Sequence, residues 1–296
     1  MEDIILEKRF GDIDKNWAGL KKAGVCIVPV PYEGTLTYMK GASKGPEAII
    51  NASLNMELFD DELHTETYKA GIYTSPPLAI DSEDTPEKVI DKVKDVTGEI
   101  LKAEKLPVIL GGEHSITIGA VKAVKEVFQN VSVLSLDAHY DLKDIYKDSK
   151  YNHACIARRV QEICPIVEVG VRSLAKEEKD FLDSQPANVN IVSVYDILET
   201  PNWKKKASQL LSNTIYITID LDVFDPSVMP SVGTPEPGGI GWYEFLDFLR
   251  IVIKDKKVVG LDIVELSPRE GHIAPDFLAA KLLYRLLGYI FYNSRR

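Results

Sequence analysis

Cysteine is scarce in this sequence of 296 residues. The three cysteines, Cys26, Cys155 and Cys164, form no Cys-x-x-Cys pair. An odd and sparse set of this kind argues against a disulfide-stabilised secreted protein and indicates a reducing compartment.

Long apolar runs and a basic excess are missing as well. No run of 18 apolar residues occurs, and the first nine residues contain no long apolar segment of the kind found in signal peptides. The formal net charge is −10, which argues against nucleic acid or an anionic membrane as the main partner. We therefore expect a cytoplasmic protein without a nucleic-acid or membrane partner, and its acidic balance suits a small cationic substrate.

Apolar and charged residues occur in the proportions of a globular protein. Hydrophobic residues make up 45% of the chain and charged residues 27%, which is enough for a packed core and argues against disorder. The length is normal for one large α/β domain. Because we find no repeat, low-complexity tract or clear linker, we expect residues 1–296 to form a single domain.

Eight short apolar segments alternate with helical segments along the chain. The predicted strands are 24–30, 71–73, 107–110, 131–136, 166–171, 190–194, 214–219 and 258–266. Almost continuously apolar strands, each followed by a helix, indicate a parallel sheet that is covered on both faces. This pattern fits a closed barrel and an open doubly wound sheet equally well.

Three potential metal ligands follow the apolar segment 131–136. Since alternate side chains of an extended chain share one face, Asp137, His139 and Asp141 are expected on one face where the strand ends. Burying them beside an apolar segment is costly unless a cation lies between them. A straight strand would separate Asp137 from Asp141 by roughly 13 Å. One metal would not reach both unless the chain curls, whereas two metals about 3.5–4 Å apart would fit.

Polar residues recur at the ends of other predicted strands, where open parallel sheets place their ligands. His114 follows Gly111-Gly112, and Asp220 and Asp222 follow the strand at 214–219. Each motif alone is explained equally well by capping or turn chemistry. Together they predict four carboxylates and two neutral imidazoles, which balance two divalent cations and, without thiolates, favour Mn²⁺ over structural Zn²⁺. The predicted ligands are His114, Asp137, His139, Asp141, Asp220 and Asp222.

The same segments resemble the signature segments of the arginase/agmatinase ureohydrolase family. They are Gly-Gly-Glu-His-Ser at 111–115, Leu-Asp-Ala-His-Tyr-Asp at 136–141 and Ile-Asp-Leu-Asp-Val-Phe-Asp-Pro at 219–226, and the segments 233–239 and 261–268 are similar to two more. The resemblance implies a three-layer α/β/α fold around an eight-stranded, mostly parallel sheet. It further implies two Mn²⁺ ions per subunit and assembly into homo-trimers or homo-hexamers.

The resemblance also implies a role for each candidate site residue. Asp137 and Asp220 would bridge the two metals, and the remaining shells would be His114 with Asp141 and His139 with Asp222. His153 matches the family's proton-shuttling histidine, although Ala154 follows it where glycine is commoner. Glu265 matches the glutamate that binds the guanidinium, and Asp141 would also help to stabilise the tetrahedral intermediate. The implied reaction is hydrolysis of a guanidinium to an amine and urea by a metal-bridging hydroxide.

The loop at 142–152 governs the expected substrate. It lacks the run of Ser, Thr and Asn with which arginases hold the α-carboxylate and α-amino group, and it is more like the agmatinase branch. We therefore expect agmatine as the substrate, cleaved to putrescine and urea in polyamine biosynthesis. Asp144 or Asp148 could face its distal amine. If Lys143, Lys147 and Lys150 point inward instead, guanidinobutyrate would be favoured, and arginine or a formimino compound stays open.

A non-catalytic, metal-binding or regulatory relative is the alternative of a different class. Such proteins typically lose a metal ligand or the proton shuttle. This chain keeps all six ligands together with His153 and Glu265, so the sequence favours an enzyme.

Overall fold

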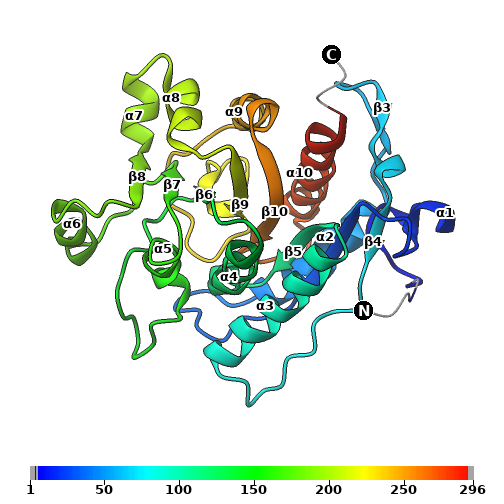
Figure 1. The fold of residues 1–296 in the computed structure, drawn as a ribbon, viewed down its shortest axis with the longest axis horizontal. Helices are drawn as coiled ribbons and strands as arrows, with labels where there is room; N and C mark the ends of the chain where they lie inside the picture. The colour runs from blue at the N-terminus through cyan, green and yellow to red at the C-terminus, as the bar shows by residue number, and fades with distance from the viewer. Residues whose placement is uncertain (1–3, 5, 293–296) are drawn as a thin grey trace.

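The structure, a computed structural model, describes residue 4 and residues 6–292, and it is built around a sheet of eight parallel strands (Figure 1). The strand order is β4-β1-β5-β10-β9-β6-β7-β8, so within the described residues the sheet is open, with β4 and β8 at its edges. Of the two arrangements that the pattern allowed, the doubly wound sheet is therefore the one adopted. The strands are β1 (Val25–Val30), β4 (Ile72–Thr74), β5 (Leu106–Gly111), β6 (Val131–Leu136), β7 (Ile166–Val169), β8 (Val189–Val192), β9 (Thr214–Asp220) and β10 (Lys257–Val264).

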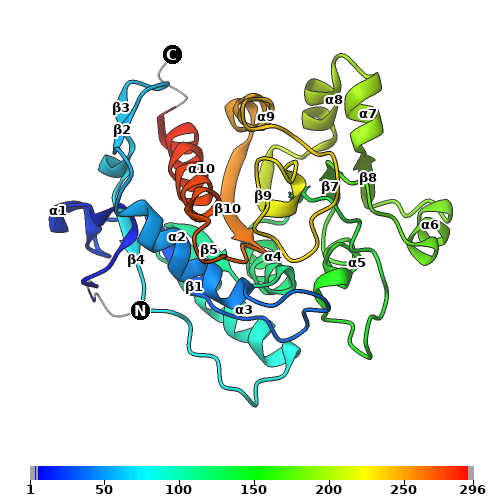
Figure 2. The ribbon, with the colours of Figure 1, turned by 180° about the vertical axis from the view of Figure 1, so that it is seen from behind.

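Helices cover both faces of the sheet, which gives the expected three layers. Successive side chains of a strand point to opposite faces, and accordingly Val108 and Leu110 join one hydrophobic cluster while Ile109 joins the other. Figures 1 and 2 show α3, α4 and α5 below the sheet and α8, α9 and α10 above it. The helices are α1 (Lys15–Ala18), α2 (Gly45–Ser53), α3 (Pro86–Lys102), α4 (Thr117–Val127), α5 (Ile156–Val160), α6 (Lys176–Asp183), α7 (Val194–Glu199), α8 (Trp203–Leu210), α9 (Trp242–Asp255) and α10 (Ile273–Tyr292).

All eight predicted strands are present, with their ends shifted slightly. The hairpin of β2 (Phe59–Asp60) and β3 (Thr65–Glu66) was not predicted, because two-residue strands carry no periodic signal. The segment 153–163 is not one continuous helix. There the Asn152 side chain accepts a hydrogen bond from the Ala154 amide and begins a short 3₁₀ turn, η5 (His153–Cys155), and α5 starts only at Ile156.

Four neighbouring strands bring the candidate residues to one edge of the sheet. β5, β10, β9 and β6 are adjacent and parallel, so their carboxyl ends meet. His114, Glu265, Asp220 and the segment 137–141 each follow or end one of these strands. No helix in the described part of the chain is long and apolar enough to cross a membrane. Residues 1–3 and 5, on which the signal-peptide prediction partly depended, lie outside the described residues.

Candidate active site

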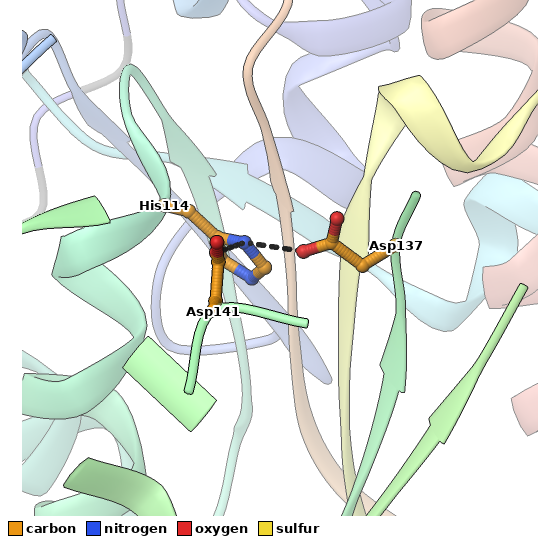
Figure 3. Close-up of side chains that lie close together, drawn as sticks. All are labelled: His114, Asp137 and Asp141. Atoms are coloured by element: carbon orange, nitrogen blue, oxygen red, sulfur yellow. Dashed lines mark ion pairs between the residues drawn. The ribbon is translucent and has the colours of Figure 1, made fainter. Parts of the chain in front are cut away.

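Three carboxylates converge on one nitrogen of a buried histidine. The Nδ1 atom of His114 lies 3.1 Å from Oδ2 of Asp137, 3.5 Å from Oδ2 of Asp141 and 3.4 Å from Oδ2 of Asp220. Figure 3 shows the side chains of Asp137 and Asp141, both from the segment that follows β6, pointing toward the His114 ring. His114 is 1% exposed, and its Nδ1 atom has no hydrogen-bond partner. Four donor atoms of this kind, withdrawn from water around one point, form a site for a cation.

A chain of hydrogen bonds fixes the tautomer of His114. Its Nε2 atom lies 2.8 Å from Oγ1 of Thr218, and the Thr218 hydroxyl donates to Oδ1 of buried Asp262 at 2.5 Å. Because the Thr218 hydroxyl donates its only proton to Asp262, its oxygen can only accept from His114. Nε2 of His114 therefore carries the proton and donates it to Thr218. The Nδ1 lone pair is therefore left for a metal, as is usual for metal-binding histidines. Sequence reasoning missed Thr218, because a threonine inside an apolar strand carries no distinctive signal.

A second group of ligands shares Asp137 with the first. Nδ1 of His139 lies 2.8 Å from Oδ2 of Asp222 and 3.7 Å from Oδ1 of Asp137. The two groups that could each hold a metal ion are thus His114 with Asp137 and Asp141, and Asp137 with His139 and Asp222. The donor set fits hard or borderline divalent cations, since it contains carboxylates and imidazoles and no thiolate. The two overlapping groups contain five of the six predicted ligands, and the sixth, Asp220, lies beside the first group with its Oδ2 atom 3.4 Å from Nδ1 of His114.

The segment 137–141 is curled, and the expectation of a straight strand is wrong. β6 ends at Leu136, Oδ1 of Asp137 accepts the His139 amide at 2.6 Å, and Asp141 has a φ of +46°. Asp137 and Asp141 therefore reach the same nitrogen of His114, and one cation would contact both. The argument for two metals now depends on the second ligand group and not on the length of the segment.

Burial makes the site electrostatically incomplete without cations. Burial and the neighbouring Asp137 charge raise the pKa of Asp141 to about 7, and burial with Asp222 holds the pKa of Asp220 well above its usual range. Burial lowers the pKa of His139, but the charges and hydrogen bonds of Asp222 and Asp137 together outweigh burial and raise this pKa well above its usual range. Each of these shifts favours the protonated side chain, whereas a metal ligand must be a carboxylate or a neutral imidazole. Divalent cations would supply the missing positive charge.

Removing bound metal should therefore destabilise the protein more at high pH than at low pH. A carboxyl whose pKa is higher in the folded state stabilises the fold fully below its unfolded pKa, about 3.9, and loses that contribution as the pH rises through the folded value. Asp141 and Asp220 are of this kind. Asp137 is not, because His114 and His139 lower its pKa by more than burial raises it, so Asp137 affects stability only at lower pH.

We expect the Tm of chelated protein to fall between about pH 5 and pH 8 while Mn²⁺-loaded protein stays level. Scanning calorimetry with and without Mn²⁺ at both pH values measures this. A metal-independent Tm at pH 8 would contradict the site described here.

Glu265 follows β10 in a strained conformation that aims it at the ligand cluster. Its φ is +65°, its amide donates to the carbonyl of Gly112 at 2.8 Å, and its Oε1 accepts the His114 amide at 2.8 Å. Positive φ at a non-glycine residue is costly and is found mainly at functional sites. Burial and the charge of Glu113 hold the pKa of Glu265 well above its usual range, so its carboxylate form calls for a cation.

His153 lies beside the cluster and is held by residues that sequence reasoning missed. Its amide donates to Oγ1 of Thr35 at 3.1 Å, and Thr35 donates to Glu113. Burial, with the charges of His114 and His139, lowers the pKa of His153 to about 4 in the metal-free site, so the ring is neutral at neutral pH. Ala154 adopts a negative φ in the 3₁₀ turn, and glycine is therefore not required there.

A cavity of about 190 Å³ joins these residues. Lys143 and Tyr146 of the loop 142–152 line it, and Nζ of Lys143 lies over the Tyr146 ring, 4.1 Å from the centroid. Asp144 instead pairs with Arg159 at 2.6 Å, outside the lining, and Asp148, Lys147 and Lys150 do not line the cavity. The described lining is Leu36, Thr37, Tyr38, Met39, His114, His139, Asp141, Lys143, Tyr146, His153, Ala154, Ser173, Ala175, Glu178, Asp220, Asp222, Gly233, Thr234 and Glu265.

Known proteins share this fold and sequence over nearly the whole chain. The family described as "Arginase family" matches residues 23–288. The N(1)-aminopropylagmatine ureohydrolase of Synechocystis sp. is 40% identical over 275 residues, which are 90% of this chain and 89% of that protein. The agmatinase of Pyrococcus horikoshii is 34% identical over 96% of this chain and 98% of its own. The crystal structure of the agmatine ureohydrolase of Thermoplasma volcanium superposes with a TM-score of 0.87 at 31% identity, covering 99% of this chain and 98% of that one.

Proposed function

Because this chain belongs to the arginase family of ureohydrolases, we propose that it is a binuclear manganese enzyme that cleaves the guanidinium of agmatine to putrescine and urea. The observation that carries the proposal is the placement of Glu265 beside two overlapping groups of metal ligands in one cavity. The ligands would be His114, Asp137, His139, Asp141, Asp220 and Asp222. The single-domain organisation, the cytoplasmic location and the assembly into homo-trimers or homo-hexamers stay predictions.

The cavity supports a substrate without a carboxylate. Its wall provides the carboxylates of Asp141, Glu178 and Glu265, and Lys143 is occupied by Tyr146 and by Glu177, 3.7 Å away. A dicationic amine suits this charge better than guanidinobutyrate or arginine. N¹-aminopropylagmatine is a second candidate, favoured by the 40% identity to a relative named for that substrate.

Glu265 would bind the planar guanidinium group. After accepting the His114 amide, Oε1 keeps one lone pair and Oε2 keeps both, so the carboxylate can accept two parallel N–H bonds. The guanidinium carbon would then lie next to Asp141 and the other carboxylates of the ligand cluster. Metal ions held by these residues would supply Lewis-acid activation of water at neutral pH.

His153 would move the proton that the reaction requires. Hydrolysis forms a C–O bond at the guanidinium carbon and breaks the bond between that carbon and the nitrogen that carries the alkyl chain. A proton from the attacking water goes to this nitrogen as the amine leaves. A neutral imidazole that lines the cavity can accept this proton and pass it on. Asp141 would stabilise the tetrahedral intermediate by accepting hydrogen bonds from its amino groups.

A substrate panel tests this function. We expect Mn²⁺-loaded protein to release urea from agmatine or N¹-aminopropylagmatine with a kcat/KM at least about tenfold above that for arginine, guanidinobutyrate or a formimino compound, a difference of about 1.4 kcal/mol. Urea or ammonia release, with the amine product identified by chromatography, gives the ranking. A tenfold preference for a substrate with a carboxylate would reject the agmatinase proposal, and no product from any of them would reject hydrolysis.

A further inference from the structure

We propose that Thr35 is the positioning residue of His153, and that its hydroxyl determines which ring nitrogen of His153 carries the proton. Thr35 lies within the loop 31–41 that follows β1, and Leu36 and Tyr38 of the same loop line the cavity. It also contacts the segment that carries His153, more than 100 residues later in the chain. The inference rests on the proposed function only in assuming that His153 transfers a proton.

Every hydrogen-bonding group of Thr35 is used at this junction. Its amide donates to Oε2 of Glu113 at 2.6 Å, and its hydroxyl donates to Oε1 of Glu113 at 2.6 Å. Its carbonyl accepts a hydrogen bond from the side-chain Nδ2 of Asn152 at 3.4 Å. The hydroxyl oxygen accepts the His153 amide at 3.1 Å and lies 3.3 Å from Nδ1 of the same residue.

Glu113 fixes the direction of the Thr35 proton. Its side chain is fully buried and receives two donors from Thr35 and one from the Ser115 hydroxyl, at 2.5 Å. A carboxylate that is surrounded by donors accepts from all of them. The Thr35 hydroxyl has one proton, and its oxygen lies 2.6 Å from Oε1 of Glu113 but 3.3 Å from Nδ1 of His153, so this proton goes to Glu113. The lone pairs of the hydroxyl therefore face His153.

The proton of neutral His153 must then be on Nδ1. An oxygen that already gives its proton to Glu113 can only accept from Nδ1, so Nδ1 is the donor. Nε2 keeps its lone pair, and the ring lines the cavity. Thr35 thus prepares His153 to accept a proton at Nε2 from the substrate side. Thr35 itself belongs to the loop that forms part of the cavity wall.

Kinetics of three variants test the role of the hydroxyl. We expect Thr35→Val to lower kcat about 10- to 100-fold with KM changed less than about twofold, since a positioned acid–base group contributes about 10²–10⁴. Thr35→Ser keeps the hydroxyl and should recover kcat to within about threefold of the parent. Thr97→Val, which removes a buried hydroxyl on α3 without a partner among the described residues, is the matched control and should leave kcat unchanged.

The tautomer of His153 provides a readout that is independent of turnover. The chain has five histidines, so ¹H–¹⁵N spectra of the full chain loaded with diamagnetic Mg²⁺ can be assigned by comparison with His153→Gln. We expect the His153 proton on Nδ1 in the parent and in Thr35→Ser, and a shift towards Nε2 in Thr35→Val. A parent with the proton on Nε2, a Thr35→Val variant with unchanged kcat, or a Thr35→Ser variant as slow as Thr35→Val would overturn the proposal. If the parent releases no urea, the proposed function fails, and the spectra still decide the role of Thr35.

Discussion

Replacing Asp137 with Asn should remove metal and activity together. Asp137 is the member shared by both ligand groups, with one oxygen 3.1 Å from His114 and the other 3.7 Å from His139. An amide offers one neutral oxygen where a carboxylate offers two charged ones, so both groups are weakened by one substitution. We expect kcat/KM to fall at least about a thousandfold, which corresponds to about 4 kcal/mol of lost metal stabilisation in the transition state.

Metal analysis and urea release measured on the same sample test this expectation. Asp255→Asn is the matched control, because Asp255 is exposed and precedes β10 at the opposite end of the sheet. It should keep two Mn²⁺ per chain and full activity. An Asp137→Asn protein that retains both metals and turns over normally would show that Asp137 is not a shared ligand.

Replacing Glu265 with Gln should instead separate metal binding from substrate binding. The amide oxygen of Gln can still accept the His114 amide, so the ligand cluster should stay assembled. The negative charge that faces the guanidinium is lost, along with one acceptor. At about 1.5–3 kcal/mol for each hydrogen bond to a charged group, we expect kcat/KM to fall about 10²- to 10³-fold.

The Mn²⁺ content of the Glu265→Gln protein distinguishes this role from a structural one. It should stay at two per chain, with the kinetic loss confined to guanidinium substrates. Glu199→Gln, at an exposed position at the end of α7, provides the control and should change neither quantity. Loss of metal in Glu265→Gln would place the residue in the metal site, and unchanged kinetics would remove it from substrate binding.

The sequence predicted the fold and the meeting of the candidate ligands at one edge of the sheet because both depend on local patterns. Apolar runs of strand length followed by helices indicate a covered parallel sheet, and polar motifs after those runs must meet at one edge. His114 and Asp220 could therefore be paired with Asp137 before any geometry was known. The adjacency of β5, β10, β9 and β6 was not predictable in this way, since strand order depends on packing between distant segments.

The supporting residues were missed for a related reason. Thr35 and Glu113 meet His153 across the chain, and Asp262 reaches His114 through Thr218. Threonine and buried acids have no periodic or spacing signal that would single them out. The sequence also left open which charged residues of the loop 142–152 face the substrate. A surface lysine or aspartate can pair with any neighbour of opposite charge, as Asp144 does with Arg159, and the sequence does not show which neighbours the fold brings near.

Urea release from agmatine during a Mn²⁺ titration of the chelated protein tests the central claim most directly. The claim is that two metal sites and Glu265 act together on one guanidinium carbon. We predict no urea without metal and a rate that rises until two Mn²⁺ are bound per chain. Full activity at one Mn²⁺ per chain, or no urea from agmatine or its aminopropyl derivative when two are bound, would contradict it.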